Sequence, residues 1–175
     1  MAKGETVTHT LLRKIEREEG RFAVKSYMMR RLGSRDHSRK ELFTKAIRKE
    51  YPKNIIENVL DELEEKGYLN DISFAEKFAQ DKSHLNKWGP NKIKAHLYKK
   101  GISGDVAEQS IQKVFEDKNI KEVLLHLVLK KKRRFLREED LYKRKKKVVD
   151  HLARKGYRSS NIFNHIDELM KAIEQ

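Results

Sequence analysis

The sequence predicts an all-α protein of three tandem three-helix repeats that form an elongated, curved array. Straight-chain residues that favour helices are abundant, and only eight Gly and two Pro interrupt them. The hexapeptide HLYKKG at 96–101 is echoed 55 residues later as HLARKG at 151–156. A repeat of this length is typical of a modular helical array. The chain is 37% hydrophobic and 39% charged, so each repeat has a thin core and we expect neighbouring repeats to share interfaces.

The N-terminal part of the chain is predicted to be a tail or an extra helix at 1–21, followed by the first repeat at 22–68. Residues 8–19 have a helical pattern of their own, and Gly20 separates them from the next apolar positions. Two interpretations stay open. Either a short extra helix precedes the repeat, or one long helix runs through Gly20.

Local signals set the helix boundaries of the first repeat. Ser38 and Glu41 have the spacing of a capping box, so a helix begins near residue 38. Pro52 suits the first turn of the helix that follows. Gly67, just beyond an apolar stripe, is a candidate for the left-handed residue that ends this helix.

The second repeat, predicted at 69–117, has the clearest signals. Asp71 or Ser73 is suited to cap its first helix, and Trp88-Gly89 ends it before Pro90 begins the next one. Trp88 is open to two interpretations, a stacking surface for a nucleic-acid base or a plug between helices. Its place beside a Gly-Pro turn favours packing.

The third repeat is predicted at 118–175. An apolar block at 123–128 alternates like a strand around one histidine, but no second strand is available to pair with it, so we predict a helix. A longer helix follows from about 140 to 155, and Ser159 or Ser160 is expected to cap the last helix.

Positive charge is concentrated in the last third of the chain. The net charge is +14, and residues 118–175 hold 17 Lys and Arg against eight Asp and Glu. No intramolecular acidic run is available to neutralise these clusters, so a polyanionic or nucleoprotein partner is the natural inference, with a merely solvated basic face as the alternative. The first-choice contact residues are Lys130, Lys131, Lys132, Arg133, Arg134, Lys143, Arg144, Lys145, Lys146 and Lys147. The second-choice residues, expected to face mostly outward, are Lys92, Lys94, Lys99 and Lys100.

The sequence predicts no catalytic residue, no cofactor and no metal site. The chain has no Cys, no nucleophile elbow, no phosphate-binding glycine loop and no HExxH pair. The carboxylates at 138–140 resemble part of a metal-dependent nuclease site, but three acidic residues at a helix start more simply complement the helix dipole. No apolar run is long enough to span a bilayer and no signal core follows residues 1–4, so we expect a cytoplasmic protein without a membrane partner.

Around the second repeat, one set of residues resembles a known family. The residues are Gly67-Tyr68-Leu69-Asn70-Asp71, Phe74-Ala75, Gly89-Pro90, Ile93, Leu97 and Lys100-Gly101-Ile102. Their combined spacing resembles the RecX family of bacterial recombinase regulators, with a strong match over about residues 60–105. His96 departs from the pattern, because family members commonly carry an acidic residue there, which puts any ion pair at that position in doubt.

The resemblance implies a non-catalytic monomer that binds the RecA recombinase filament, with single- or double-stranded DNA met inside the filament. It also implies inhibition of strand exchange, ATP hydrolysis and co-protease activity, and hence a role in homologous recombination, DNA repair and the SOS response. Two alternative functions stay open. The second-ranked function is a stand-alone DNA-binding protein of the helix-turn-helix type, and the third-ranked is a small nuclease.

Overall fold

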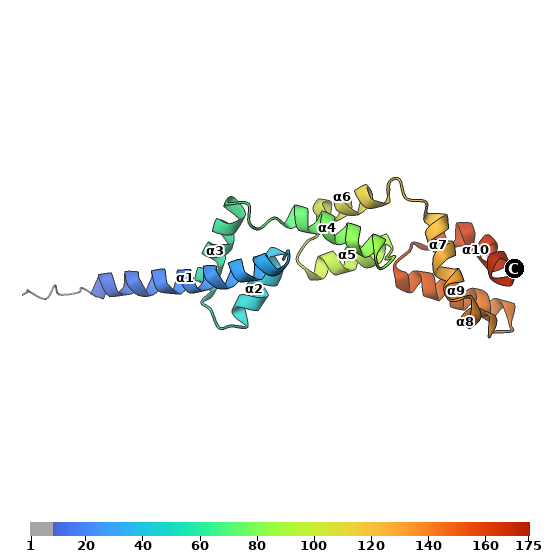
Figure 1. The fold of residues 1–175 in the computed structure, drawn as a ribbon, viewed down its shortest axis with the longest axis horizontal. Coiled ribbons are helices and arrows are strands. Elements are labelled where there is room, and N and C mark those ends of the chain that lie inside the picture. The colour runs from blue at the N-terminus through green and yellow to red at the C-terminus, as the bar shows by residue number, and fades with distance from the viewer. Residues whose placement is uncertain (1–8) are drawn as a thin grey trace, which may run out of the picture. The chain divides into compact units, whose positions relative to one another are not determined.

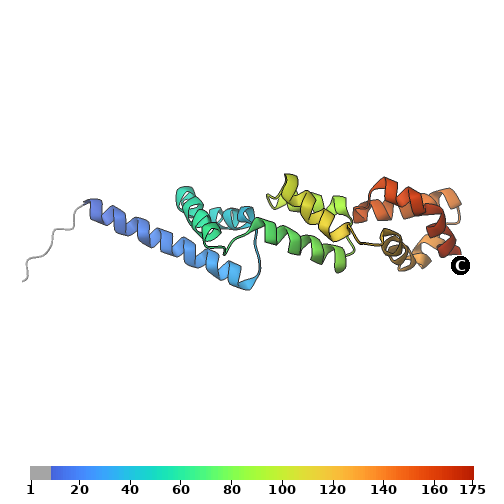
Figure 2. The ribbon, with the colours of Figure 1, turned by 90° about the horizontal axis from the view of Figure 1, so that it is seen from above.

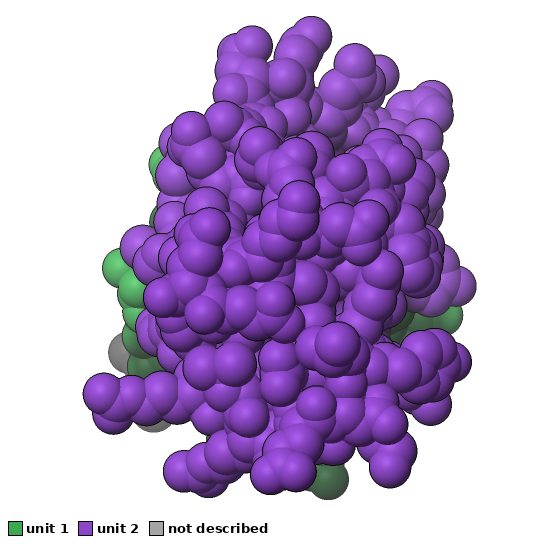
Figure 3. Space-filling view, turned by 90° about the vertical axis from the view of Figure 1, so that its right-hand side faces the viewer, with its two compact units in different colours: residues 1–74 green, residues 75–175 purple. Residues whose placement is uncertain are grey.

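The computed structural model describes residues 9–175, and every regular element in that range is a helix (Figure 1). The all-α prediction is therefore confirmed for this part of the chain. Residues 1–8 lie outside the described residues. The prediction that no signal core follows residues 1–4 concerns this segment. The chain forms two compact units, residues 1–74 and residues 75–175, coloured separately in Figure 3. Within the described residues, no helix is both long and apolar enough to cross a membrane.

Unit 1 contains three helices, α1 (His9–Ser34), α2 (Arg39–Ile47) and α3 (Lys53–Glu65), and the first turn of α4 (Asp71–His84). Helix α1 continues without a break through Gly20, as Figure 2 shows, so the interpretation of one long helix is the correct one. Its later turns contribute Val24, Tyr27 and Met28 to a core shared with α2 and α3.

Two capping predictions for unit 1 are confirmed: the capping box at the start of α2 and the left-handed glycine after α3. The Ser38 hydroxyl accepts a hydrogen bond from the backbone N–H of Glu41 at 3.2 Å, and the Glu41 carboxylate accepts one from the Ser38 N–H at 3.4 Å. Gly67, just after α3, has a φ of 72°, which is the left-handed conformation expected there. The next backbone N–H, that of Tyr68, then bonds back to the carbonyl of Leu63 at 2.9 Å.

Asp71 has a role that the sequence did not indicate. It was a candidate cap for its own helix α4, but its Oδ1 accepts a hydrogen bond from the backbone N–H of Arg39, the first residue of α2, at 2.8 Å. The cap of α4 is instead Asn70, whose Oδ1 accepts from the N–H of Ser73 at 2.9 Å. The prediction that Asp71 or Ser73 caps α4 is therefore wrong by one residue.

Unit 2 contains the rest of α4 and six further helices. They are α5 (Pro90–Lys99), α6 (Gly104–Phe115), α7 (Ile120–Leu129), α8 (Lys132–Leu136), α9 (Leu141–Lys155) and α10 (Ser159–Glu174). The short helix α8 was not predicted, because five residues within a cationic run carry no readable apolar period. Ser159 and Ser160 do not cap α10, which has no side-chain hydrogen bond at its N-cap residue, Arg158.

One helix of each repeat buries a similar pair of apolar positions. In α2, α5 and α9 the two residues of the pair stand four apart and are fully buried. They are Leu42 and Ala46, Ile93 and Leu97, and Val148 and Leu152. The echoed hexapeptide also ends alike in both copies, since Gly101 has a φ of 87° and Gly156 a φ of 94°.

Within unit 2, the second and third repeats meet backbone to backbone. The N–H of Gly89 donates to the carbonyl of Lys155 at 2.7 Å, and the N–H of Asn91 donates to the carbonyl of Gly156 at 3.0 Å. The Tyr157 hydroxyl adds a hydrogen bond to the carbonyl of Lys87 at 3.2 Å. The start of α5 is thereby fixed to the end of α9.

Trp88 packs inside this region. Its ring centroid lies 4.5 Å from that of His96 and 6.5 Å from that of Phe78, and the Lys92 ammonium lies 4.7 Å from the Trp88 centroid. The ring is half-buried, with aromatic and cationic neighbours on several sides. This arrangement supports the packing interpretation rather than a free stacking surface.

Candidate nucleoprotein-binding surface

The first basic cluster, residues 130–134, surrounds the short helix α8. Phe135 is 3% exposed and packs in the core of the third repeat, which holds α8 against the unit. Arg133 and Arg134, directly before Phe135, are exposed, whereas Lys132 and Lys131, three and four residues before Phe135, are half-buried. They line a depression of about 550 Å³ together with Leu129 and Arg137.

No side chain of this cluster forms an ion pair with any residue between 9 and 175. Lys130, Arg133 and Arg134 are exposed, while Lys131 and Lys132 are half-buried. Five adjacent positive charges without local carboxylate partners create a strong local potential that attracts anions. We name residues 130–134 the α8 cluster. Figure 3 shows the surface of unit 2, from which many long side chains project.

The second basic cluster, residues 143–147, lies in the first turns of α9 and is largely neutralised. The Arg144 guanidinium pairs with Glu174 at 3.2 Å and donates to the carbonyl of Glu138 at 2.9 Å. Two neighbours are paired as well, Lys145 with Asp167 at 2.8 Å and Lys147 with the Glu138 carboxylate.

These pairs correct one sequence interpretation. The acidic partners are single residues that the fold brings close from α10 and from the segment between α8 and α9. The second basic cluster is therefore partly neutralised without an acidic run. Lys143 and Lys146 are exposed and make no ion pair with the rest of the described chain. The second cluster therefore offers fewer unpaired charges than its sequence indicates.

Of the second-choice lysines in and just after α5, Lys94 and Lys99 are exposed, whereas Lys92 and Lys100 are half-buried. Lys92 is half-buried, with its ammonium over the Trp88 ring and 3.4 Å from the carbonyl of Arg154. Lys94 pairs with Glu108 at 2.6 Å, and the Lys100 ammonium lies 5.3 Å from the centroid of Phe78. Lys99 is exposed.

A small cleft between α8 and α9 adjoins the α8 cluster and was missed by sequence reasoning. It has a volume of about 140 Å³ and is lined by Lys131, Arg134, Phe135, Lys147, His151 and Arg154. Burial, together with the charges of Lys131, Lys155, Arg154 and Arg134, lowers the pKa of His151 to about 4. The echo between residues 96 and 151 was the one sequence signal that marked this histidine.

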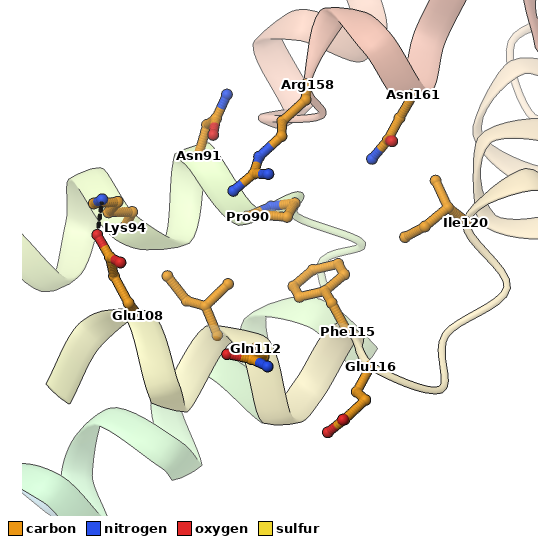
Figure 4. A pocket seen from close by; sticks show the side chains of 11 residues that line it. Pro90, Asn91, Lys94, Glu108, Gln112, Phe115, Glu116, Ile120, Arg158 and Asn161 are labelled. Atoms are coloured by element: carbon orange, nitrogen blue, oxygen red, sulfur yellow. Dashed lines mark hydrogen bonds and ion pairs between the residues drawn. The ribbon is translucent and has the colours of Figure 1, made fainter. Parts of the chain in front are cut away.

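A larger hollow of about 510 Å³ lies among α5, α6, α7 and α10 (Figure 4). Its wall is mixed, with Phe115 and Ile120 beside polar groups, and the Arg158 side chain reaches toward Pro90 and Asn91. The hollow brings together no nucleophile and base of the kind that covalent catalysis needs.

Two of the three carboxylates at 138–140 have structural roles. Asp140 caps α9, since its Oδ1 accepts from the N–H of Lys143 at 2.8 Å, and Glu138 pairs with Lys147. The Lys147 ammonium holds the pKa of Glu138 below its usual value. Among residues 9–175 no group of three His, Asp or Glu side chains is arranged to hold a metal ion.

The described fold and surface define a helical-repeat protein with a cationic third repeat. Three family models match the chain in tandem: "RecX, first three-helix domain" at residues 25–63, "RecX, second three-helix domain" at 70–111 and "RecX, third three-helix domain" at 120–165. The chain belongs to the RecX family.

Relatives from other bacteria agree with this assignment. The chain is 35% identical over 144 residues to a protein named "Regulatory protein RecX" of Chlorobium phaeobacteroides strain BS1, which covers 82% of this chain and 91% of that relative. It is 30% identical over 157 residues to a protein of the same name from Clostridioides difficile strain 630, with 90% and 73% covered.

Solved structures show the same fold. A crystal structure of regulatory protein RecX superposes with a TM-score of 0.83 at 21% identity, covering 96% of this chain and 81% of the other. The crystal structure of RecX from Lactobacillus salivarius gives a TM-score of 0.71 at 23% identity, covering 92% and 98%.

Proposed function

We propose that this chain is a non-catalytic regulator that binds the nucleoprotein filament of RecA recombinase and inhibits its strand exchange, ATP hydrolysis and co-protease activity. Membership of a family of regulatory proteins supports the proposal. The observation that carries it is the α8 cluster, five cations without ion-pair partners within residues 9–175. Such a surface fits a partner that presents phosphates and acidic side chains together.

Inhibition by binding alone needs no reactive group in the regulator. A recombinase filament changes conformation as it hydrolyses ATP, and a protein that binds one conformation more tightly shifts the filament toward it. Contact with neighbouring recombinase subunits would hinder their relative motion, and contact at the growing end would stop extension. Both routes use the same cationic surface, and we propose that the protein acts as a monomer in the cytoplasm.

The test adds purified protein to recombinase assembled on single-stranded DNA and follows ATP turnover and strand exchange. Inhibition well below one protein per recombinase indicates end capping, whereas inhibition that needs near-equal amounts indicates binding along the filament. A DNA-binding control without recombinase runs in parallel. Unchanged recombinase activity at a saturating dose would overturn the proposal.

A variant of the α8 cluster sharpens this test. Replacing Lys130, Lys132 and Arg133 by Gln removes three unpaired charges and leaves Phe135 in the core. We expect this variant to inhibit the recombinase only at higher protein concentration. Tight binding of the unaltered protein to DNA alone, with no effect on recombinase, would favour the stand-alone DNA-binding rival instead.

A further inference from the structure

We propose that the cleft between α8 and α9 is a phosphate-binding site, formed by Lys131, Arg134 and Arg154 together with His151. Neither His151 nor Arg154 belongs to the basic clusters at 130–134 and 143–147. The inference deepens the proposed function and rests on it for its biological setting. The binding step itself requires only this chain and a phosphate group.

The size of the cleft selects a small ligand. Its volume of about 140 Å³ is well below the ~300 Å³ at which pockets for drug-sized molecules begin. A phosphate group fits this range, whereas a nucleoside does not. Recognition would therefore concern the phosphate and leave the base outside, which suits a protein that binds DNA without reading its sequence.

The charges around the cleft favour an anion. Arg134 and Arg154 are exposed, Lys131 is half-buried, and none of the three forms an ion pair with another described residue. Lys147 also lines the cleft, but Glu138 already neutralises it. Guanidinium groups bind phosphate oxygens through paired, charge-assisted hydrogen bonds, which gives geometric fit as well as attraction.

His151, which lines the cleft, carries an unsatisfied polar atom. His151 Nε2 is buried and has no hydrogen-bond partner among the residues that the structure describes. A buried polar atom in this state carries a desolvation cost. A phosphate oxygen that settles against the ring would give Nε2 an acceptor and would offset the repulsion among the surrounding cations.

His151 also supplies a direct readout of binding. The groups that face its ring are Lys131 and Arg134 from the α8 region, Lys147, Arg154 and Lys155 from α9, and the neutral ring of Phe135, whose centroid lies 5.8 Å from its own. A bound phosphate would counter these charges and stabilise the protonated ring, so the pKa of His151 should rise from about 4.

The experiment follows the histidine ring signals by NMR across a pH titration of the full chain. It is run without added anion, with inorganic phosphate, and with a short single-stranded oligonucleotide that carries either a 5′-phosphate or a 5′-hydroxyl. We expect the His151 titration to move to higher pH with each phosphate source. An unchanged His151 titration at saturating phosphate would overturn the inference.

The two oligonucleotides distinguish the source of the phosphate. Equal shifts with both would assign the site to the phosphodiester backbone, and a shift confined to the 5′-phosphorylated strand would assign it to a terminal phosphate. Either result supports a phosphate site. A shift with inorganic phosphate and none with either strand would contradict a role in DNA binding.

A matched pair of double variants separates the cleft from general charge. Arg134→Gln with Arg154→Gln removes two charges from the cleft, and Lys132→Gln with Arg133→Gln removes two charges from the α8 cluster outside it. All four side chains lack ion pairs with described residues, so neither variant should disturb folding. We expect the cleft variant to lose about tenfold more affinity for phosphate and oligonucleotide than the control. Equal losses would overturn the inference.

The recombinase assay keeps this inference separate from the proposed function. If the unaltered chain leaves recombinase untouched but His151 responds to phosphate, the proposed function fails and the phosphate site stands. If the chain inhibits recombinase but His151 does not respond, the phosphate site fails and the proposed function stands.

Discussion

Gly89 and Gly156 lie in backbone contact, so close that a Cβ placed on Gly89 would come 2.5 Å from the carbonyl carbon of Gly156. The contact joins the residue before α5 to the residue after α9, more than sixty positions apart in the chain. Two hydrogen bonds between main-chain groups reinforce it. The second and third repeats therefore share an interface at which side chains larger than hydrogen cannot be accommodated.

The first prediction concerns Gly156→Ala. Gly156 has a φ of 94°, and an added Cβ would lie 2.3 Å from the Cβ of Lys92. Left-handed backbone costs a residue with a Cβ about 1–3 kcal/mol, and the collision with α5 adds to that cost. We expect a loss of more than about 3 kcal/mol in the free energy of unfolding of unit 2. Urea unfolding followed by the fluorescence of Trp88, the one tryptophan of the chain, measures it.

Gly104→Ala is the matched control. Gly104 also has a positive φ, 62°, but no atom lies within 4 Å of an added Cβ. This variant should show the backbone strain alone. If both variants lose the same stability, the close approach of Gly156 to Lys92 contributes nothing beyond local conformation.

The second prediction concerns Tyr157→Phe. The Tyr157 ring is 3% exposed, and its hydroxyl donates to the carbonyl of Lys87 across the same interface. Removing the hydroxyl should lower the free energy of unfolding by about 1 kcal/mol at pH 7. Burial raises the pKa of Tyr157 to about 12, from 10.0. The stabilisation is therefore complete below pH 10 and is lost as the pH rises toward 12.

Measurement of urea unfolding at pH 7 and at pH 11 checks both parts of this prediction. The difference between the unaltered chain and the variant should be smaller at pH 11. A difference that stays constant with pH would contradict the assigned hydrogen bond and its buried donor.

Features that depend on residues close together in the chain were predicted correctly from the sequence. Ser38 and Glu41 stand three positions apart, so their capping box was readable, and the left-handed Gly67 followed from an apolar stripe and a glycine. Asp71 could not be read in the same way, because the N–H that it accepts belongs to a helix 32 positions earlier. Capping across such a distance depends on how the helices pack.

The same limit explains the candidate site. The two basic clusters look equivalent in sequence, but only the fold brings Glu174 and Asp167 beside Arg144 and Lys145. Helix α8 and the cleft behind it likewise arise from the packing of Phe135 in the core. Composition therefore located the basic repeat, and the tertiary structure selected which of its charges are unpaired.

The third prediction concerns Asp71→Ala. The variant leaves the first N–H of α2 without its side-chain acceptor, and loss of such a cap costs about 1 kcal/mol. Burial raises the pKa of Asp71 even though Arg39 favours the ionised form, so the charge itself is partly disfavoured. Asp71→Asn keeps an acceptor without the charge and should lose less. Hydrogen exchange of the α2 amides measures the effect, and equal protection in all three proteins would contradict it.

The fourth prediction concerns Glu62, whose carboxylate forms ion pairs with three cationic side chains. Its carboxylate lies 2.6 Å from Lys25, 2.5 Å from Lys66 and 2.8 Å from Arg21. These partners, Lys25 first, hold the pKa of Glu62 well below its ordinary value of 4.5. The resulting stability is present above pH 4.5 and is lost as the pH falls through the folded-state pKa.

Glu62→Gln should therefore destabilise unit 1 at pH 7, and the difference from the unaltered chain should shrink below pH 4. The matched control is Glu57→Gln on the same helix, which removes one exposed pair with Lys53 at 3.7 Å and should cost at most about 0.5 kcal/mol. Urea unfolding followed by circular dichroism compares them. Similar losses for both variants at pH 7 would contradict a special role for Glu62.

The last prediction separates paired from unpaired charge in DNA binding. One variant replaces Lys130, Lys132 and Arg133 by Gln, which removes three charges that the described chain leaves unpaired. The other replaces Arg144, Lys145 and Lys147 by Gln, which removes three charges that carboxylates already neutralise. Each phosphate neutralised on single-stranded DNA contributes ~0.7 to the slope of log affinity against log salt. The first variant should therefore lower that slope by ~2, and the second by less, although both lose the same formal charge. Affinity for a single-stranded oligonucleotide, measured across a salt series, provides the two slopes. If the slopes of the two variants are equal, net charge rather than the local pairing of side chains controls the binding of phosphate.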